Sequence, residues 1–170
     1  MKRYLFSVAL LLALLPAGIS FAATAASAEP VTVAIFPLKN AYGEVKYDSL
    51  AWTYADSLYA YLNTQAGAGT TFTIIPMDDI RDQMLALNVD PNSPSYETEI
   101  FKIAKALGAK KVMWGSYLVK YEKANIEIKV IDAKTLMPDR KNIAEKIRAP
   151  FPEALSTVAE AGTRLLPGLH

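Results

Sequence analysis

The chain has 170 residues, with 18 Lys and Arg against 17 Asp and Glu, one His and no Cys. With His170 as the single imidazole and no thiol, the composition excludes or nearly excludes a Ser-His-Asp triad, a Cys-His dyad, Cys-rich zinc and iron–sulfur sites, and any disulfide. A net charge close to zero also argues against nucleic acid or anionic lipid as a partner, because both favour a clustered basic surface.

The first 28 residues have the layout of a cleaved signal peptide. Lys2 and Arg3 precede an apolar run over Leu5–Leu15, and the small residues of Ala26-Ser27-Ala28 come directly before Glu29. We therefore expect cleavage between Ala28 and Glu29, and export of a single domain over residues 29–170.

The location of the exported chain follows from two further features. Without a Cys near the expected cleavage point there is no attachment site for an acyl anchor, so we expect a periplasmic protein, with peripheral association with the outer membrane left open. Cleavage after Ala22 is an alternative. Retention of Leu5–Phe21 as a membrane anchor is another, because no charged residue occurs between Leu5 and Ala28.

The first third of the mature chain predicts a strand, a helix and a strand. Val31–Phe36 is apolar almost throughout, which is typical of a central strand buried on both faces. A loop over Lys39–Lys46 leads to a helix that Asp48 or Ser49 caps. Thr71–Ile75 is rich in β-branched residues and predicts a second strand, parallel to the first.

Two helices are expected next. Asp78 is placed to cap a helix over Asp79–Leu87, because its carboxylate can accept from the first free backbone N–H groups. Ser93 is placed as the N-cap of a further helix, with Pro94 in its first position and Leu107 near its end.

The remainder predicts an antiparallel meander and a closing helix. Lys110–Tyr121 and Lys123–Asp132 alternate with period two and predict a hairpin, with Lys141–Arg148 as a third strand. The closing helix is expected over Pro152–Leu166, and its inward residues are Leu155, Val158, Ala159 and Leu165. The order β-α-β-α-α-β-β-β-α predicts an α/β domain with a mixed β-sheet.

Two groups of acids could carry chemistry, and each has a structural explanation. Asp78, Asp79 and Asp82 could bind a hard cation, but acids in the first turn are favoured by the helix dipole. Glu97 and Glu99 point away from one another on a helix and cannot act as a pair. We therefore predict no catalytic residue, no metal and no cofactor.

Aromatic residues form the most specific candidate binding surface. Tyr59 lies off the apolar stripe of its predicted helix, and Tyr42 and Tyr47 lie in the preceding loop. Together the three rings could form an exposed patch that docks a partner or stacks on a sugar. The alternative is that they belong to the core and its margin.

Two motifs carry a resemblance to a known family. They are a helix-to-strand passage, A-x-x-L-G-A followed by W-G-S over residues 104–116, and a hairpin end, I-D-A-x-T over residues 131–135. With the strands at Val33–Leu38 and Phe72–Pro76, they resemble the domain at the amino terminus of TolB and its relatives in bacterial envelopes, including CsgG-like and FlgO-like proteins. The likeness extends over Val31–Leu166.

The resemblance implies structural roles and a class of function. Gly108 would end a helix, Gly115 would allow close packing of a strand, and Asp132 would form a turn. Leu136 stands where the family commonly has Gly after that turn. The implied function is a non-enzymatic module that binds other envelope proteins.

Two functions stay open on the sequence. The first is an exported, non-enzymatic protein-interaction module that takes part in assembly or maintenance of a bacterial envelope, secretion or surface-appendage complex, with a homo-oligomer as one arrangement. It would act through a sheet edge, the Tyr42, Tyr47 and Tyr59 patch, or a helix face. The second is a periplasmic small-molecule or saccharide-binding domain, with weak carboxylate-based hydrolysis as a variant. It requires a recess that joins acids of separate elements with Tyr or Trp.

Overall fold

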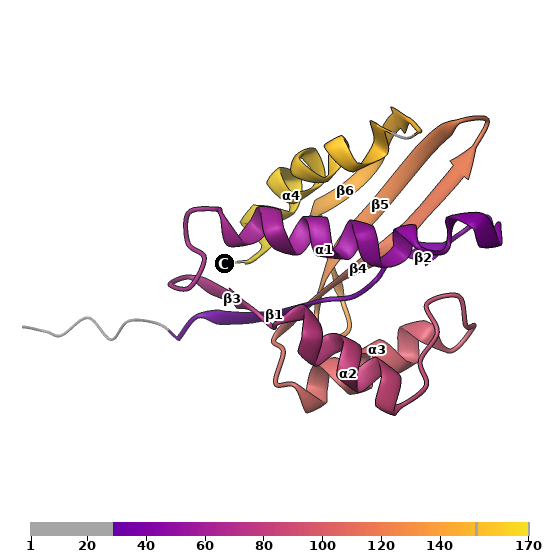
Figure 1. Ribbon diagram of the computed structural model, residues 1–170. Coiled ribbons are helices and arrows are strands. Elements are labelled where there is room, and N and C mark those ends of the chain that lie inside the picture. Colours follow the sequence, from indigo (N-terminus) through magenta and orange to yellow (C-terminus); the bar gives the residue numbers. More distant parts are fainter. Residues whose placement is uncertain (1–28, 152, 170) are drawn as a thin grey trace, which may run out of the picture.

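A mixed sheet organises the computed structural model, which describes residues 29–151 and 153–169 (Figure 1). The expected signal peptide, residues 1–28, lies outside the described residues. Within the described part, six strands form one sheet: Val31–Ile35 (β1), Lys39–Asn40 (β2), Phe72–Ile74 (β3), Lys111–Lys120 (β4), Lys123–Asp132 (β5) and Pro138–Pro150 (β6). Their order is β3-β1-β4-β5-β6, with β2 beside β4. The strands β1, β3 and β4 are parallel and β4, β5 and β6 antiparallel, so the predicted α/β class with a mixed sheet is confirmed.

The central strand β1 separates two hydrophobic cores, as its continuous apolarity predicts. Val33 and Ile35 point into the larger core, under the helices Leu50–Asn63 (α1) and Val158–Leu165 (α4). Ala34 and Phe36 point into the smaller core, against Met77–Ala86 (α2) and Tyr96–Ala106 (α3). Helices therefore cover both faces of β1.

The predicted loop over Lys39–Lys46 contains two short elements that the sequence pattern missed. Lys39 and Asn40 form β2 and pair with Ser116 and Tyr117 of β4, and a 3₁₀ helix, η1, follows at Val45–Tyr47. A two-residue strand has too few side chains to show an alternating pattern, so only its pairing with β4 reveals it.

Asn40 anchors this segment, and it is buried with 5% of its surface exposed. Its Nδ2 donates to the Asp48 carboxylate at 2.8 Å and to the Glu44 carbonyl at 2.9 Å, while its own N–H donates to Asn92 Oδ1 at 3.2 Å. Asp48 also accepts from Asn92 Nδ2 at 3.0 Å. Of the two predicted N-cap residues of α1, Ser49 holds that position, without a side-chain capping bond, and Asp48 instead joins two loops.

The helices α2 and α3 begin at different residues from those predicted. Pro76 is the N-cap of α2, so Asp78 lies inside the first turn and does not cap it. α3 begins at Tyr96 with Ser95 as its N-cap, because residues 91–95 form turns of their own in which the Ser95 N–H donates to Ser93 Oγ.

The closing segment starts with one turn of 3₁₀ helix, Glu153–Thr157 (η2), before α4 and a last 3₁₀ turn at Leu166–Leu169 (η3). A 3₁₀ turn has three residues rather than 3.6, so the inward stripe shifts. Leu155 and Ala159 are exposed, contrary to the prediction, and Ala154, Ala161 and Gly162 are buried.

The helices cover unequal parts of the two sheet faces (Figure 1). α1 and α4 lie over the face of the larger core, along the length of β4, β5 and β6. α2 and α3 lie against β1 and the start of β4, and the remaining parts of β4, β5 and β6 extend past them. Across the described ranges, no helix has both the length and the apolarity that crossing a membrane requires.

Candidate functional site

The three predicted aromatic residues lie in different surroundings. Tyr42 is 47% exposed, and the Lys120 ammonium lies 5.6 Å from the centre of its ring. Tyr47 packs against the larger core, and its ring meets Phe151 edge-on with centroids 5.3 Å apart. Tyr59 is half-buried nine residues into α1, about 13 Å along the helix axis from its start. The structure thus places Tyr59 apart from the other two rings.

Tyr59 lines a recess of about 350 Å³ between α1 and α2, with Asp56 and Asp78. This set of residues is the one that the saccharide-binding alternative requires. Arg81, however, is bonded to both carboxylates: it donates to Asp56 at 2.6 and 2.7 Å and to Asp78 at 3.2 Å. Its guanidinium also lies 4.8 Å from the centre of the Trp52 ring. Arg81 therefore links α2 to α1 through Asp56, whereas its contact with Asp78 lies within α2 and leaves the Asp78 side chain 91% exposed.

The other acids singled out in the sequence are exposed or take part in helix starts. In the part of the chain that the structure describes, no group of three or more His, Asp or Glu side chains could hold a metal ion. Asp79 and Asp82 are exposed on α2, and Glu99 accepts from Ser95 Oγ at 2.9 Å at the start of α3.

Gly108 and Gly115 stand where a side chain would be costly. Gly108 has φ +71°, its N–H donates to the Lys105 carbonyl, and the next N–H donates to the Ala104 carbonyl, which is the pattern of a Schellman C-cap. A Cβ on Gly115 would lie 1.8 Å from the Glu127 carbonyl oxygen of the paired strand. Close approach of β4 to β5 thus depends on the missing side chain.

Asp132 organises the turn between β5 and β6. Its Oδ1 accepts from the backbone N–H groups of Thr135 and Lys134, at 2.8 and 3.0 Å, and from Thr135 Oγ1. These hydrogen bonds, first that from the Thr135 N–H, lower the pKa of Asp132 below its ordinary value. Leu136 closes the turn with φ +58°, in the conformation that Gly would adopt without strain.

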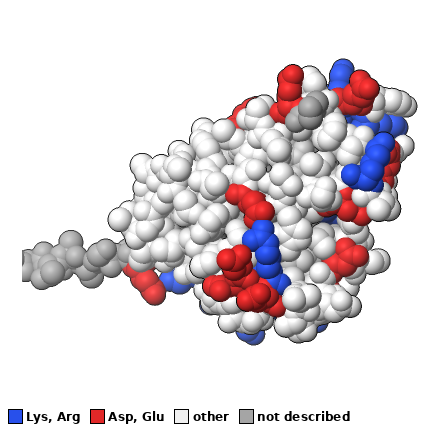
Figure 2. Space-filling model, in the orientation of Figure 1, with Lys and Arg blue, Asp and Glu red and all other residues white. Residues whose placement is uncertain are grey.

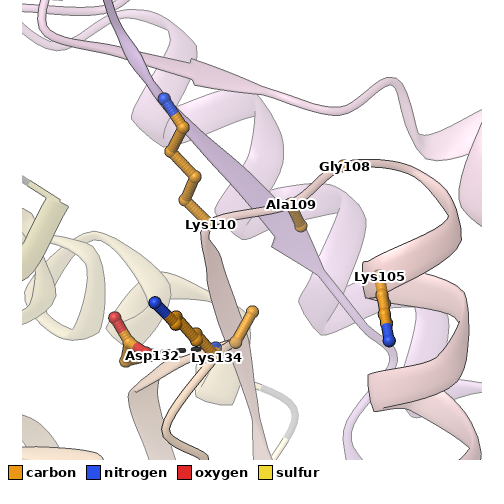
Figure 3. Close-up of a pocket in the computed structure, with 7 residues that line it drawn as sticks. Lys105, Gly108, Ala109, Lys110, Asp132 and Lys134 are labelled. Carbon is orange, nitrogen blue, oxygen red and sulfur yellow. Dashed lines mark hydrogen bonds between the residues drawn. The ribbon is translucent and has the colours of Figure 1, made fainter.

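A recess of about 540 Å³ lies beside this turn and has lysines on its rim (Figure 3). Lys110 reaches away from the recess to Glu29, at 2.9 Å, and Lys105 points in a different direction from α3. The Asp132 carboxylate is occupied by its own turn. Because these ammonium groups do not converge, the recess offers no common site for an anion.

A different surface is formed by the part of the sheet that α2 and α3 leave uncovered. Alternation along β4 and β5 sends Tyr117, Ile126 and Ile128 into the larger core, so the residues between them point to the other side. We call this side the open face. Its uncharged residues are Ala41, Trp114, Ser116, Leu118, Asn125 and Ile143.

Lysine and arginine predominate on the open face. Its cations are Lys39, Lys120, Lys123, Lys129 and Arg148. Glu127 is an acid on the same face, and it pairs with Lys129 at 2.8 Å. Glu145, at the nearby bulge of β6, is 3.9 Å from Lys146. Lys39, Lys123 and Arg148 form no ion pair with any described residue.

The open face also has a hollow and incompletely bonded polar atoms. Lys39, Ala41, Trp114, Ser116 and Lys129 help to line a hollow of about 300 Å³. Trp114 Nε1 and Asn125 Oδ1 are buried and have no hydrogen-bond partner in the described part of the chain. Both atoms are enclosed by the protein, so neither is exposed to a partner on the open face.

The view in Figure 2 shows a different charge distribution. Acids gather at α2 around a cation, and a broad area over α1 is nearly free of charge, since Asp56 is the one charged residue between positions 49 and 77. Residues 29–108 contain ten acids and five Lys or Arg, whereas residues 109–169 contain seven acids and eleven Lys or Arg. The near-neutral total thus conceals a clustered basic face, which composition alone could not show.

Comparison with known proteins finds likeness in fold. No protein-family model and no curated protein matches the chain. Similar solved structures include the LpoB C-terminal domain from Salmonella enterica (14% identity, 67% of this chain and 80% of that one, TM-score 0.46). Lipoprotein GNA1162 from Neisseria meningitidis is 14% identical, with 82% of this chain and 99% of that one covered and a TM-score of 0.48. TolB from Acinetobacter baumannii is 17% identical, with 82% of this chain and 29% of that one covered and a TM-score of 0.43. TolB, the expected relative, is thus among the similar structures, and scores this low transfer no function.

Proposed function

We propose that the domain is an exported, non-enzymatic interaction module of a bacterial envelope complex, and that the open face is its docking surface. The signal-peptide pattern and the resemblance to TolB amino-terminal domains support the location and the class. The observation that carries the proposal is the open face itself, where Lys39, Lys123 and Arg148 have no ion-pair partner among the described residues and Lys39 lines a hollow with Trp114.

The open face differs from the usual solvated face of an antiparallel sheet. An antiparallel sheet can face water on one side, but its exposed residues are then usually polar. Here Trp114, Leu118 and Ile143 lie half-buried among the cations, which is the mixture of apolar centre and polar surround found in protein interfaces. The two hydrogen bonds between Arg81 and Asp56 weigh against the saccharide-binding alternative, since they engage one of the two carboxylates of its recess.

A photo-crosslinking experiment in cells tests this proposal. A photoreactive phenylalanine analogue replaces Ser116 on the open face, and in a matched control it replaces Ala60, which is exposed on α1. We expect a defined envelope protein to be captured from position 116 and not from position 60, by a chain that mass spectrometry finds to begin at Glu29. Capture from position 60 alone, or equal capture from both, would overturn the assignment of the open face.

A further inference from the structure

We infer that the segment docking on the open face is an extended, acidic stretch of a protein. The inference rests on the proposed function and names the chemistry of its partner. Lys39, Lys123 and Arg148 lack ion-pair partners in the described chain, so their charges are available to carboxylates of another molecule.

The spacing of the cations sets the length of that segment. Lys123 and Lys129 lie on one strand, six residues apart, which is about 20 Å at the rise of an antiparallel strand. Lys120 and Arg148 lie near the Lys123 end, and Lys39 lines the hollow with Lys129 at the other. An extended chain advances about 3.3–3.6 Å per residue, so roughly six or seven residues cover this distance.

The residues between the cations favour a protein segment over an acidic polysaccharide. Leu118 and Ile143 are aliphatic and cannot stack on a sugar ring, whereas they can pack against apolar side chains. Trp114 is half-buried, with its ring edge-on to Tyr96 at 6.2 Å, so it is not a freely exposed stacking platform.

Fluorescence anisotropy with a defined probe tests the inference. The probe is a fluorescein-labelled peptide of about eight residues in which Glu alternates with Leu or Phe, and the matched peptide has Gln at each Glu. We expect the Glu peptide to bind the mature chain, the Gln peptide to bind at least about tenfold more weakly, and added salt to weaken the binding of the Glu peptide.

Two double variants locate the site. Lys123→Glu with Arg148→Glu reverses charge on the open face, and Lys134→Glu with Lys141→Glu makes the same change at exposed positions near the β5–β6 turn. We expect a loss of about tenfold or more for the first pair and within about twofold for the second. If the first variant does not fold, Lys123→Gln with Arg148→Gln replaces it, and an intermediate loss is expected.

Several results would overturn the inference. They are equal binding of the Glu and Gln peptides, no binding of either, equal losses for the two variants, or binding of polygalacturonate in place of the peptide. Capture of a protein from position 116 through a segment without acids would refute the acidic partner and leave the proposed function standing. Absence of any capture there would refute the function as well.

Discussion

At the scale of single residues, Gly115 is the position where the fold depends most on a missing side chain. We expect Gly115→Ala to lower the free energy of unfolding by at least about 2 kcal/mol, because its Cβ would overlap the Glu127 carbonyl and the rigid backbone of β5 cannot yield. Urea unfolding measures the change. Ser116→Ala on the same strand is the control and should shift stability by less than about 0.5 kcal/mol. Equal losses for both variants would contradict this account.

Leu136 is strained in a turn that Asp132 otherwise stabilises. With φ +58°, its Cβ is close to the following carbonyl, and Gly at this position removes that clash. We expect Leu136→Gly to stabilise the domain by about 0.5–1 kcal/mol, after the greater freedom of Gly in the unfolded chain is subtracted. Thermal unfolding checks this. Met137→Gly at the exposed neighbouring position should bring no gain, and a loss of stability in Leu136→Gly would sink the explanation.

At the scale of elements, the two turn residues of the β4–β5 hairpin are of types that rarely adopt the positive φ of that turn. Tyr121 and Glu122 have φ +51° and +57°, as a two-residue type I′ turn requires, although Asn-Gly is the pair that adopts it most readily. Replacing them together by Asn and Gly should raise stability by about 1 kcal/mol in calorimetry. Replacement by two alanines removes the side chains without relieving the backbone, and a similar gain there would count against this reasoning.

The loop network around Asn40 joins β2 to the connection before α3. We expect Asn40→Ala to cost about 1–3 kcal/mol, since it leaves the Glu44 carbonyl without this donor and the Gly43 N–H without this acceptor, and takes one of two donors from Asp48. Hydrogen exchange should accelerate across residues 41–48, which the Asn40 side chain holds in place. Asn63→Ala removes one exposed hydrogen bond within α1 and serves as the control. Unchanged exchange in residues 41–48 would show that the loop is held by other contacts.

The major elements follow from hydrophobic periodicity, and the errors have local causes. The continuous apolarity of Val31–Ile35 and the alternation in β5 suffice to predict strands and their buried faces. The predicted N-caps of α2 and α3 are wrong because Pro76 takes the N-cap position of α2 and a series of turns delays the start of α3. Leu155 was misplaced because η2 has a 3₁₀ period.

At the scale of the whole molecule, the candidate site depends on information that single segments do not contain. The alternation of β4 and β5 already assigns Lys120, Lys123 and Lys129 to the sides opposite the apolar residues. That these sides form one face, and that α2 and α3 leave it uncovered, is decided by strand order and helix placement. The three tyrosines were grouped because they are close in sequence, but Tyr59 lies well along α1, away from Tyr42 and Tyr47, which precede the helix.

Residues 109–169 carry more cations than acids, and we expect the open face, to which they contribute most of the cations, to bind an acidic partner. Cations without ion-pair partners on a half-buried surface attract an acidic partner, and salt weakens that attraction. A domain that uses the open face in this way loses its partner when the charge there is reversed, while its fold is unchanged, because Lys123 and Arg148 make no ion pairs within the described chain.

The most direct test is crosslinking in cells from position 116, with and without Lys123→Glu and Arg148→Glu in the same chain. The account predicts a single envelope adduct in the unaltered background and at least about a tenfold smaller yield in the reversed one, with the Lys134→Glu and Lys141→Glu pair close to the unaltered level. An adduct of undiminished yield after reversal of charge would contradict the claim that the open face recognises its partner through these cations.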